Sequence, residues 1–238
     1  MKLSNVFAMA GAMWRSERAL VMPLAGLFYF LPSLALLLLL PGAPPPADPG
    51  SDAALDALLA YARDNAGAII SANVVQLVGA VILYTLFLAP GRPTLGETMS
   101  LAAARIVSFA LASILVMAAL TVSALLVVPA LYLIGRFFLV GTVIAAERRT
   151  PVEAIARSIE LTRGRGWWCF IAAAVPFLAG QVAVSVAGGF YSALVLAGVD
   201  SAVGHLFFNG LAALGSTFAW VLTLLVKIVV YRRLSSGT

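Results

Sequence analysis

Four stretches of this chain carry almost no side chain that water would solvate well. They span residues 19–40, 66–89, 101–147 and 167–231. Within the third stretch only Arg105 and Arg136 carry charge before Glu147 closes it. A helix needs about 20 apolar residues to cross a hydrocarbon core about 30 Å thick. A membrane β-barrel would instead alternate apolar and polar residues, whereas these runs are continuous. The sequence therefore predicts an all-α bundle of transmembrane helices.

The composition supports the same class. Hydrophobic residues make up 62% of the 238 residues and charged residues only 11%, whereas soluble domains carry about 25% charged residues. The formal net charge of +5 is explained by basic loops on one side of a membrane. No basic patch with interleaved aromatic residues lies outside those loops, so a nucleic-acid partner is not expected.

The flanking residues divide the apolar stretches into six spans within a single membrane domain, residues 1–238. The expected spans are 19–40, 67–89, 104–128, 131–146, 167–197 and 203–231. The first run is longer than the 7–15 residues of a signal-peptide core, so we expect it to be retained. A loop at 41–66 separates the first two spans; it opens with five prolines and continues as a short helical segment. Pro129 separates the third and fourth spans.

Positive charge gives the expected orientation. One side of the membrane holds Lys2, Arg15, Arg18, Arg92, Arg148, Arg149, Arg157, Arg163, Arg165, Arg232 and Arg233. Arg105 and Lys227, near helix ends, are expected to snorkel to that same side. The other side holds only Arg63, among aspartates. By the positive-inside rule both termini are cytoplasmic, which agrees with an even number of spans.

A repeated pattern precedes each pair of spans. Thr94 with Glu97, and Thr150 with Glu153, form capping-box sequences, in which a threonine cap is followed three residues later by glutamate. Ser4 and Asn5 are candidate caps for a third helix. These signals predict interfacial amphipathic helices at 5–17, 94–103 and 150–162, and a possible three-fold repeat of one helix plus one hairpin. The alternative is that unrelated helices share a common type of cap.

Residues 129–167 carry a more specific pattern. It comprises Pro129, Leu131-Tyr132-Leu133, Arg136-Phe137, Glu147, Pro151, Ala154-Ile155, Arg157-Ser158, Leu161-Thr162-Arg163-Gly164 and Trp167. This pattern resembles the membrane domain of the glycerophosphoryl diester phosphodiesterase family, including stand-alone bacterial inner-membrane proteins built on that domain. In fused members the phosphodiesterase activity belongs to a separate TIM barrel with histidine and acidic metal ligands. This chain has one histidine and no room for a barrel. The resemblance therefore implies a bacterial inner-membrane protein without that catalysis.

Arg136 is the most prominent polar residue of the predicted spans, because a charge inside a bilayer is costly unless it is paired or reaches the interface. Five other polar residues are predicted inside spans, four of them in the outer half. They are Asn73, Gln76, Gln181, His205 and Asn209. One interpretation is a polar cavity open to the outer side, in which Arg136 binds an anion or a lipid phosphate. The alternative is that each group bonds a neighbouring helix.

Basic and aromatic residues at 148–168 predict a surface that contacts anionic headgroups. They are Arg148, Arg149, Arg157, Arg163, Arg165, Trp167 and Trp168. We expect no cofactor and no metal, and no catalytic motif is present, so the chain is not expected to be an enzyme. Two functions stay open: a scaffold or accessory factor acting on lipid or a membrane partner, and a carrier or lipid-handling protein that uses the outer cavity.

Small residues at four-residue spacing predict close helix contacts in the last two spans. The pairs are Ala183 with Ala187, and Gly215 with Ala219. Small residues let membrane helices approach closely. These pairs fit packing between the fifth and sixth spans, or alternatively a homodimer.

Overall fold

The computed structural model describes residues 2–40, 52–89, 91, 93–199 and 201–236. Within this part of the chain every regular element is helical, and six helical segments are long and apolar enough to cross a membrane. The predicted fold class, an all-α membrane bundle with six spans, is confirmed. The predictions for the prolines of 41–50 and for Arg92 lie outside the described residues.

The six spans are built from the following helices. The first is α1 (Leu3–Ala25), the π-helical turn η1 (Gly26–Phe30) and α2 (Leu31–Leu39); α3 (Asp52–Asp64) precedes the second, α4 (Ala66–Leu88). After α5 (Leu95–Ala103) come α6 (Ile106–Ser123), then α7 (Val127–Arg136) with α8 (Val140–Glu147). After α9 (Pro151–Leu161) come α10 (Gly166–Leu196) and α11 (Ala202–Ser235).

The amino-terminal helix agrees with the prediction in its extent but not in its cap. The predicted cap at Ser4 or Asn5 is wrong, because α1 begins at Leu3 and Lys2 stands at the N-cap. Glu17 leaves helical conformation, with φ −114° and ψ 15°, and this kink separates the helical segment 3–16 from the span, close to the predicted boundary at 17. Val6 and Ala10 are completely buried and α1 packs on α11. Burial against α11 explains why this segment joins the bundle.

The capping boxes of the other two interfacial helices are confirmed. In both, the threonine oxygen accepts from the N3 backbone and the N3 glutamate accepts from the threonine backbone N–H. At Thr94 these hydrogen bonds lower the pKa of the Glu97 carboxyl. Helices α5 and α9 each precede a pair of spans, and the segment of α1 before the kink at Glu17 precedes the first span. A repeat also requires the three units to share one arrangement, so the three-fold repeat stays a prediction.

The fourth span is interrupted. Residues 137–139 separate α7 from α8, although one continuous helix is predicted at 131–146. Pro129 lies in the first turn of α7 rather than between two spans, a position where proline loses no intrahelical hydrogen bond. The prediction that Pro129 separates the third and fourth spans is wrong. The third span is correspondingly shorter than expected.

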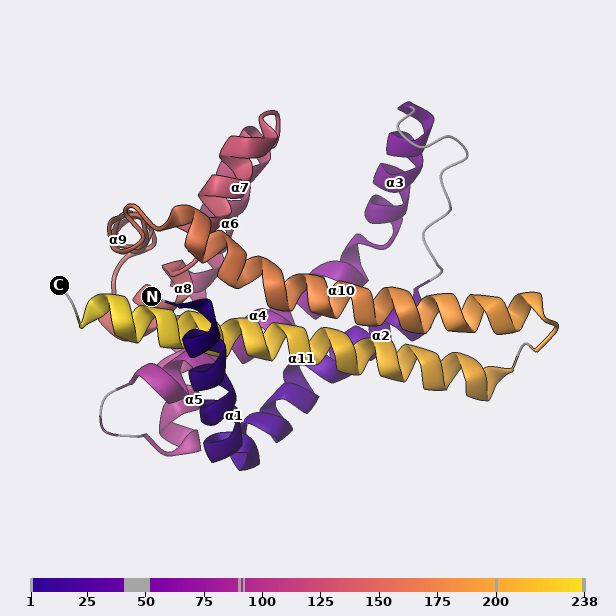
Figure 1. The fold of residues 1–238 in the computed structure, drawn as a ribbon, viewed down its shortest axis with the longest axis horizontal. Helices are drawn as coiled ribbons and strands as arrows, with labels where there is room; N and C mark the ends of the chain where they lie inside the picture. Colours follow the sequence, from indigo (N-terminus) through magenta and orange to yellow (C-terminus); the bar gives the residue numbers. More distant parts are fainter. Residues whose placement is uncertain (1, 41–51, 90, 92, 200, 237–238) are drawn as a thin grey trace.

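Figure 1 shows α10 and α11 as a long antiparallel pair, with the start of α1 and the end of α11 at the same end of the molecule. The far end of the pair projects away from the other helices. A Cβ on Gly180 would meet Ala219, and one on Gly215 would meet the Cβ of Ala183. The predicted small-residue contact between the fifth and sixth spans is confirmed. The homodimer stays a prediction.

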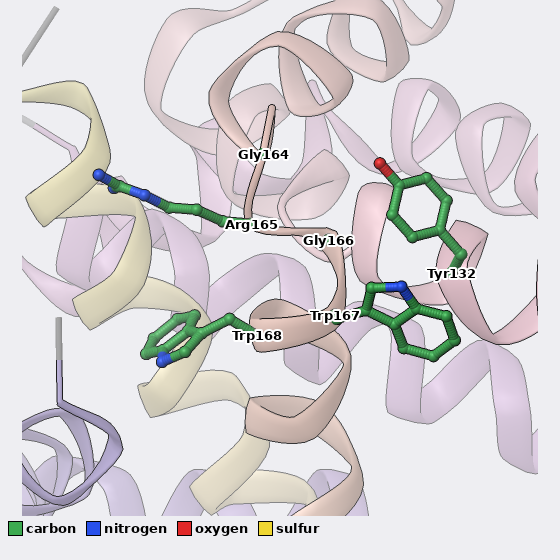
Figure 2. A pocket seen from close by; sticks show the side chains of 6 residues that line it. All are labelled: Tyr132, Gly164, Arg165, Gly166, Trp167 and Trp168. Atoms are coloured by element: carbon green, nitrogen blue, oxygen red, sulfur yellow. The ribbon is translucent and has the colours of Figure 1, made fainter.

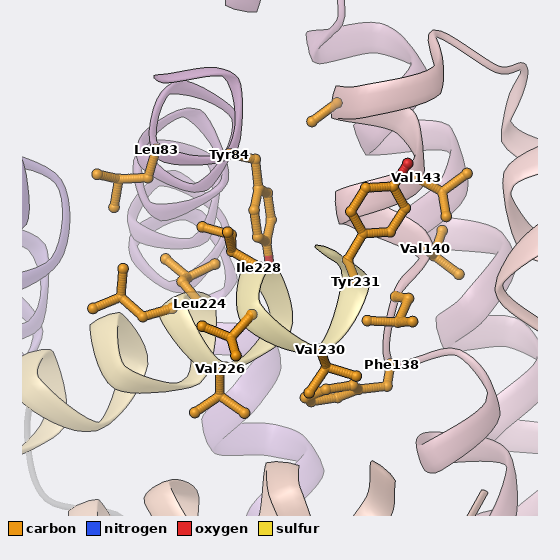
Figure 3. Packing of buried hydrophobic residues seen from close by; sticks show 14 of the residues in the cluster. Leu83, Tyr84, Phe138, Val140, Val143, Leu224, Val226, Ile228, Val230 and Tyr231 are labelled. Atoms are coloured by element: carbon orange, nitrogen blue, oxygen red, sulfur yellow. The ribbon is translucent and has the colours of Figure 1, made fainter. Parts of the chain in front are cut away.

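The core lies at the end of the molecule that carries the termini. Val226, Ile228 and Val230 of α11 are almost completely buried, and they pack among residues of α4, α8 and the 137–139 segment (Figure 3). Farther from the termini, the helices expose apolar residues such as Ile114 and Val182. Apolar surface of this extent on membrane-spanning helices faces lipid.

Arginines close helix ends at the core. Arg105 is 8% exposed, and its Nη1 donates to the Ala145 carbonyl oxygen in the last turn of α8 at 2.6 Å. Arg232 Nη2 donates to the Phe87 carbonyl oxygen in the last turn of α4, also at 2.6 Å. The last four carbonyls of a helix have no partner within the helix, and arginine can supply one.

The expected snorkelling of Arg105 is therefore wrong, because its guanidinium points into the protein. Lys227 does not snorkel outward along α11 either. Its Nζ lies 5.5 Å from the centroid of the Phe138 ring, in the segment between α7 and α8. That geometry fits a cation–π contact.

Arg105→Met should destabilise the protein, because methionine keeps much of the length but cannot donate to the Ala145 carbonyl. Leaving a buried acceptor unpaired costs about 1–3 kcal/mol. Thermal unfolding in detergent should show a clear fall in Tm, while the matched change at exposed Arg18 should have little effect. Equal stability of the two variants would contradict this role of Arg105.

Candidate functional site

Helix α9 docks on the interruption of the fourth span. Ser158 Oγ accepts a hydrogen bond from the Leu139 backbone N–H at 3.2 Å and donates to the Arg136 carbonyl oxygen at 2.8 Å. Thr162 Oγ1 lies 3.3 Å from that same carbonyl oxygen. A backbone group without a partner is expensive in a membrane protein. The hydroxyl of Ser158 therefore pairs one group on each side of the break and ties α9 to α7.

Helix α7 also crosses the start of α10 at very short range. A Cβ on Gly135 would collide with the Gly166 carbonyl oxygen, and a Cβ on Gly166 would collide with the Tyr132 ring. Both glycines are buried. Their missing side chains allow the two backbones to approach, as small residues do in membrane helix contacts. This crossing and the Ser158 hydrogen bonds fix α7, α9 and the start of α10 relative to one another.

Arg136 ends α7 beside this crossing. Its guanidinium carbon lies 5.7 Å from the centroid of the Tyr132 ring, and its Cδ approaches Gly166. Its Nη1 is buried and has no hydrogen-bond partner in the described part of the chain. Arg136 thus lies at the first turn of α10, near the arginine-rich end of the molecule.

A cavity of about 470 Å³ opens at this first turn (Figure 2). Its lining comprises Tyr132, Gly164, Arg165, Gly166, Trp167 and Trp168. Gly164 has φ +71°, a left-handed conformation that glycine adopts without strain and that turns the chain from α9 to α10. In Figure 2, Tyr132 and Trp167 lie on one side of this turn, and Arg165 and Trp168 extend to the other. The two rings of the first pair lie 5.9 Å apart between centroids.

The start of α10 suits an anion. Arg165 occupies the N-cap position and makes no side-chain capping bond, because a guanidinium only donates hydrogen bonds. The first N–H groups of a helix have no partner within the helix and carry partial positive charge. They lie at the same turn as the Arg165 cation and the two indole N–H donors. Such a combination can hold a phosphate or carboxylate group.

The predicted headgroup-contacting residues divide into two groups. Arg149 Nε lies 2.6 Å from Glu147 Oε2, and Arg157 pairs with both Glu147 and Glu160. The bond to Glu160 raises the pKa of the Arg157 guanidinium, and it lowers the pKa of the Glu160 carboxyl. Tyr231 of α11 also donates to Glu147. Arg157 therefore serves mainly in a protein network that joins α9 to α11.

The other group faces outward. Arg148, Arg163, Arg165 and Trp167 are exposed, and Trp168 is half-buried. Arg165, Trp167 and Trp168 all line the cavity, with their side chains on both sides of the turn (Figure 2). Their contact with lipid headgroups remains a prediction, but the structure places these three together.

In the described part of the chain, Arg136 lies far from His205, one of the outer polar residues. His205 packs on Tyr191, near the far end of α10, with 5.5 Å between ring centroids. Arg136 lies beside Gly166, and 25 residues of helix at 1.5 Å per residue put these two places about 37 Å apart. The prediction that Arg136 shares a cavity with the outer polar residues is therefore wrong in its geometry. The unrecognised break at 137–139 and the contact with α10 explain the error.

The amides predicted beside Arg136 are also dispersed. Asn73 donates to the Ile69 carbonyl oxygen of its own helix, and Gln76 lies 3.4 Å from Ser33 Oγ of the first span. Gln181 is exposed and Asn209 is half-buried. Gln76 fits the alternative in which a polar group bonds a neighbouring helix, whereas the bond of Asn73 stays within α4.

Sequence reasoning missed Ser158, Tyr132 and Gly166 as parts of this site. A serine on the apolar side of an amphipathic helix, four residues after Ala154, is a signal that could have indicated Ser158. Among the described residues, no group of three or more histidine, cysteine, aspartate or glutamate side chains could hold a metal ion. No family model, curated protein or solved structure matches the chain. The resemblance to the phosphodiesterase membrane domain therefore stays a prediction.

Gly135→Ala should destabilise the protein, because the new methyl group would collide with the backbone of α10. Overpacking of this kind typically costs about 1–3 kcal/mol. A matched control is Gly188→Ala, since a Cβ at Gly188 meets nothing within 4 Å. Thermal unfolding in detergent should separate the two variants. Unchanged stability in Gly135→Ala would show that the crossing is looser than described.

Proposed function

We propose that this chain is a non-enzymatic integral membrane protein that holds an anionic lipid headgroup at the start of α10. It would act as a scaffold or accessory factor for lipid or for a membrane partner. The observation that supports the proposal most is the cavity lined by Arg165, Trp167 and Trp168 beside the uncapped first turn of α10. These groups supply charge and hydrogen-bond donors to a phosphate, and indoles favour the headgroup level of a membrane.

The position of the cavity supports a lipid ligand. It lies where α10 enters its span, at the end of the molecule that holds the chain termini and most arginines. By the positive-inside rule we place this end in the cytoplasm. The resemblance of residues 129–167 to the phosphodiesterase membrane domain supports a bacterial inner membrane. Anionic lipids of the cytoplasmic leaflet would then reach the cavity without leaving the bilayer.

The carrier alternative loses its structural basis, because it needs Arg136 beside the outer polar residues. Arg136 instead lies next to the proposed site at the start of α10. Its aliphatic part packs against Gly166, and its guanidinium adds positive charge near the first turn of α10. We therefore propose that Arg136 contributes to anion binding at the start of α10, at the arginine-rich end of the molecule.

The proposal is tested by the binding of anionic lipid to the full-length protein in detergent, measured by native mass spectrometry with phosphatidylglycerol as the probe. Arg165→Gln should weaken binding about tenfold or more, because a hydrogen bond to a charged group contributes about 1.5–3 kcal/mol. Arg165→Lys should recover only part of the loss, since lysine lacks the bidentate fork.

Arg163→Gln is the matched control, because Arg163 is exposed in the same turn but does not line the cavity. It should lose distinctly less affinity than Arg165→Gln. Equal losses in the two glutamine variants would mean that basic charge attracts lipid diffusely, which would contradict a built site. Phosphatidylcholine should bind more weakly and should respond less to either change.

A further inference from the structure

Helix α3 carries an apolar face that nothing in the described structure covers. Leu55 and Leu58 are each 56% exposed and Leu59 is 52% exposed, and α3 contains no buried residue. With Ala62, these leucines recur at the spacing of a single helical face. Arg63 and Asp56 fall to one side of this face, and Asp52 lies at its edge. An exposed leucine is ordinary, but three on one face of so short a helix form a surface that needs an apolar neighbour.

The connection to α4 fixes where this face lies. Only Asn65 separates the two helices. Its backbone N–H and its side-chain Nδ2 both donate to the Tyr61 carbonyl oxygen, and the Ile69 N–H donates to the Asn65 carbonyl oxygen. These hydrogen bonds constrain the junction, so α3 is held at the N-terminal end of α4, a membrane span. Figure 1 shows α3 turned across the direction of α10 and α11.

The lipid-facing surface of α4 continues toward α3. Ile70 is 61% exposed and Val74 is 52% exposed, both in the first half of α4. On a membrane-spanning helix these side chains meet lipid tails. The leucines of α3 thus follow an apolar surface that the bilayer already covers, one short connection away.

We propose that α3 is an interfacial helix whose leucine face inserts into the headgroup region of the leaflet opposite the arginine-rich end. Amphipathic helices bury such faces about 5–10 Å into the headgroup boundary. A second protein is a poorer occupant. A helix of 13 residues is about 20 Å long, and one face of it offers far less than the roughly 800 Å² that each partner buries in a stable interface.

The charges of α3 predict the kind of membrane contact. Asp52, Asp56 and Asp64 outnumber Arg63, so anionic lipid does not attract this helix. Insertion is driven by burial of leucine instead, and it proceeds on zwitterionic lipid and resists salt. Both properties are opposite to those expected for the cavity at α10, so the two proposals succeed or fail independently.

The test places spin labels on the full-length protein in phosphatidylcholine nanodiscs. Cys169 is the only cysteine, so Cys169→Ala provides a background for Leu58→Cys and Asp56→Cys. Two positions along a helix point in nearly opposite directions, which makes Asp56 the matched control. The Leu58 label should favour collisions with oxygen over a water-soluble nickel chelate severalfold, and the Asp56 label should show the reverse.

The pattern should persist at high salt and after addition of phosphatidylglycerol. Leu55→Cys gives a second label on the leucine face if Leu58→Cys fails to fold. Two outcomes would overturn the proposal. Equal access of the nickel chelate to both faces would place α3 free in water. Shielding of Leu58 from both reagents, with spin–spin broadening between copies, would show that a second copy of the chain covers the face.

Discussion

The hydrogen bonds that Ser158 makes at the break in the fourth span are the interaction on which the proposed site depends. Water that could pair an interrupted helix is scarce within a bilayer, so the exposed backbone groups need protein partners. One hydroxyl supplies both partners, from Leu139 on one side and to Arg136 on the other. Because Ser158 belongs to α9, satisfying the break also fixes α9. The short turn at Gly164 joins α9 to α10, so a fixed α9 also fixes the start of α10.

The arginines at one end of the molecule have two different structural roles. Arg105 and Arg232 turn inward and pair the last carbonyls of α8 and α4. Arg163 and Arg165 stay exposed at the turn before α10. A count of positive charge treats both groups alike, and it indicates only the side on which they lie. Hydrogen-bond partners, rather than burial, separate the two groups, because Arg232 pairs a helix carbonyl although it is itself exposed.

The sequence predicted those features that depend on local patterns. Long apolar runs indicated the spans, and the capping boxes at Thr94 and Thr150 marked the starts of α5 and α9. The interruption at 137–139 was not predictable in this way, because its cause is a serine from another helix and a glycine crossing at Gly135. The predicted grouping of Arg136 with the outer polar residues failed for the same reason. Positions set by contacts between distant segments cannot be derived from periodicity alone.

The most direct test of this account is whether Ser158 supports the cavity at a distance. Ser158→Ala leaves every residue of the cavity lining in place. We expect faster amide hydrogen exchange at 136–140 and at 162–168, together with weaker phosphatidylglycerol binding by the folded full-length protein. Ser185→Ala, an exposed change on α10, should alter neither measurement. Faster exchange at the break with unchanged lipid affinity would contradict the claim that the sealed interruption positions the headgroup site.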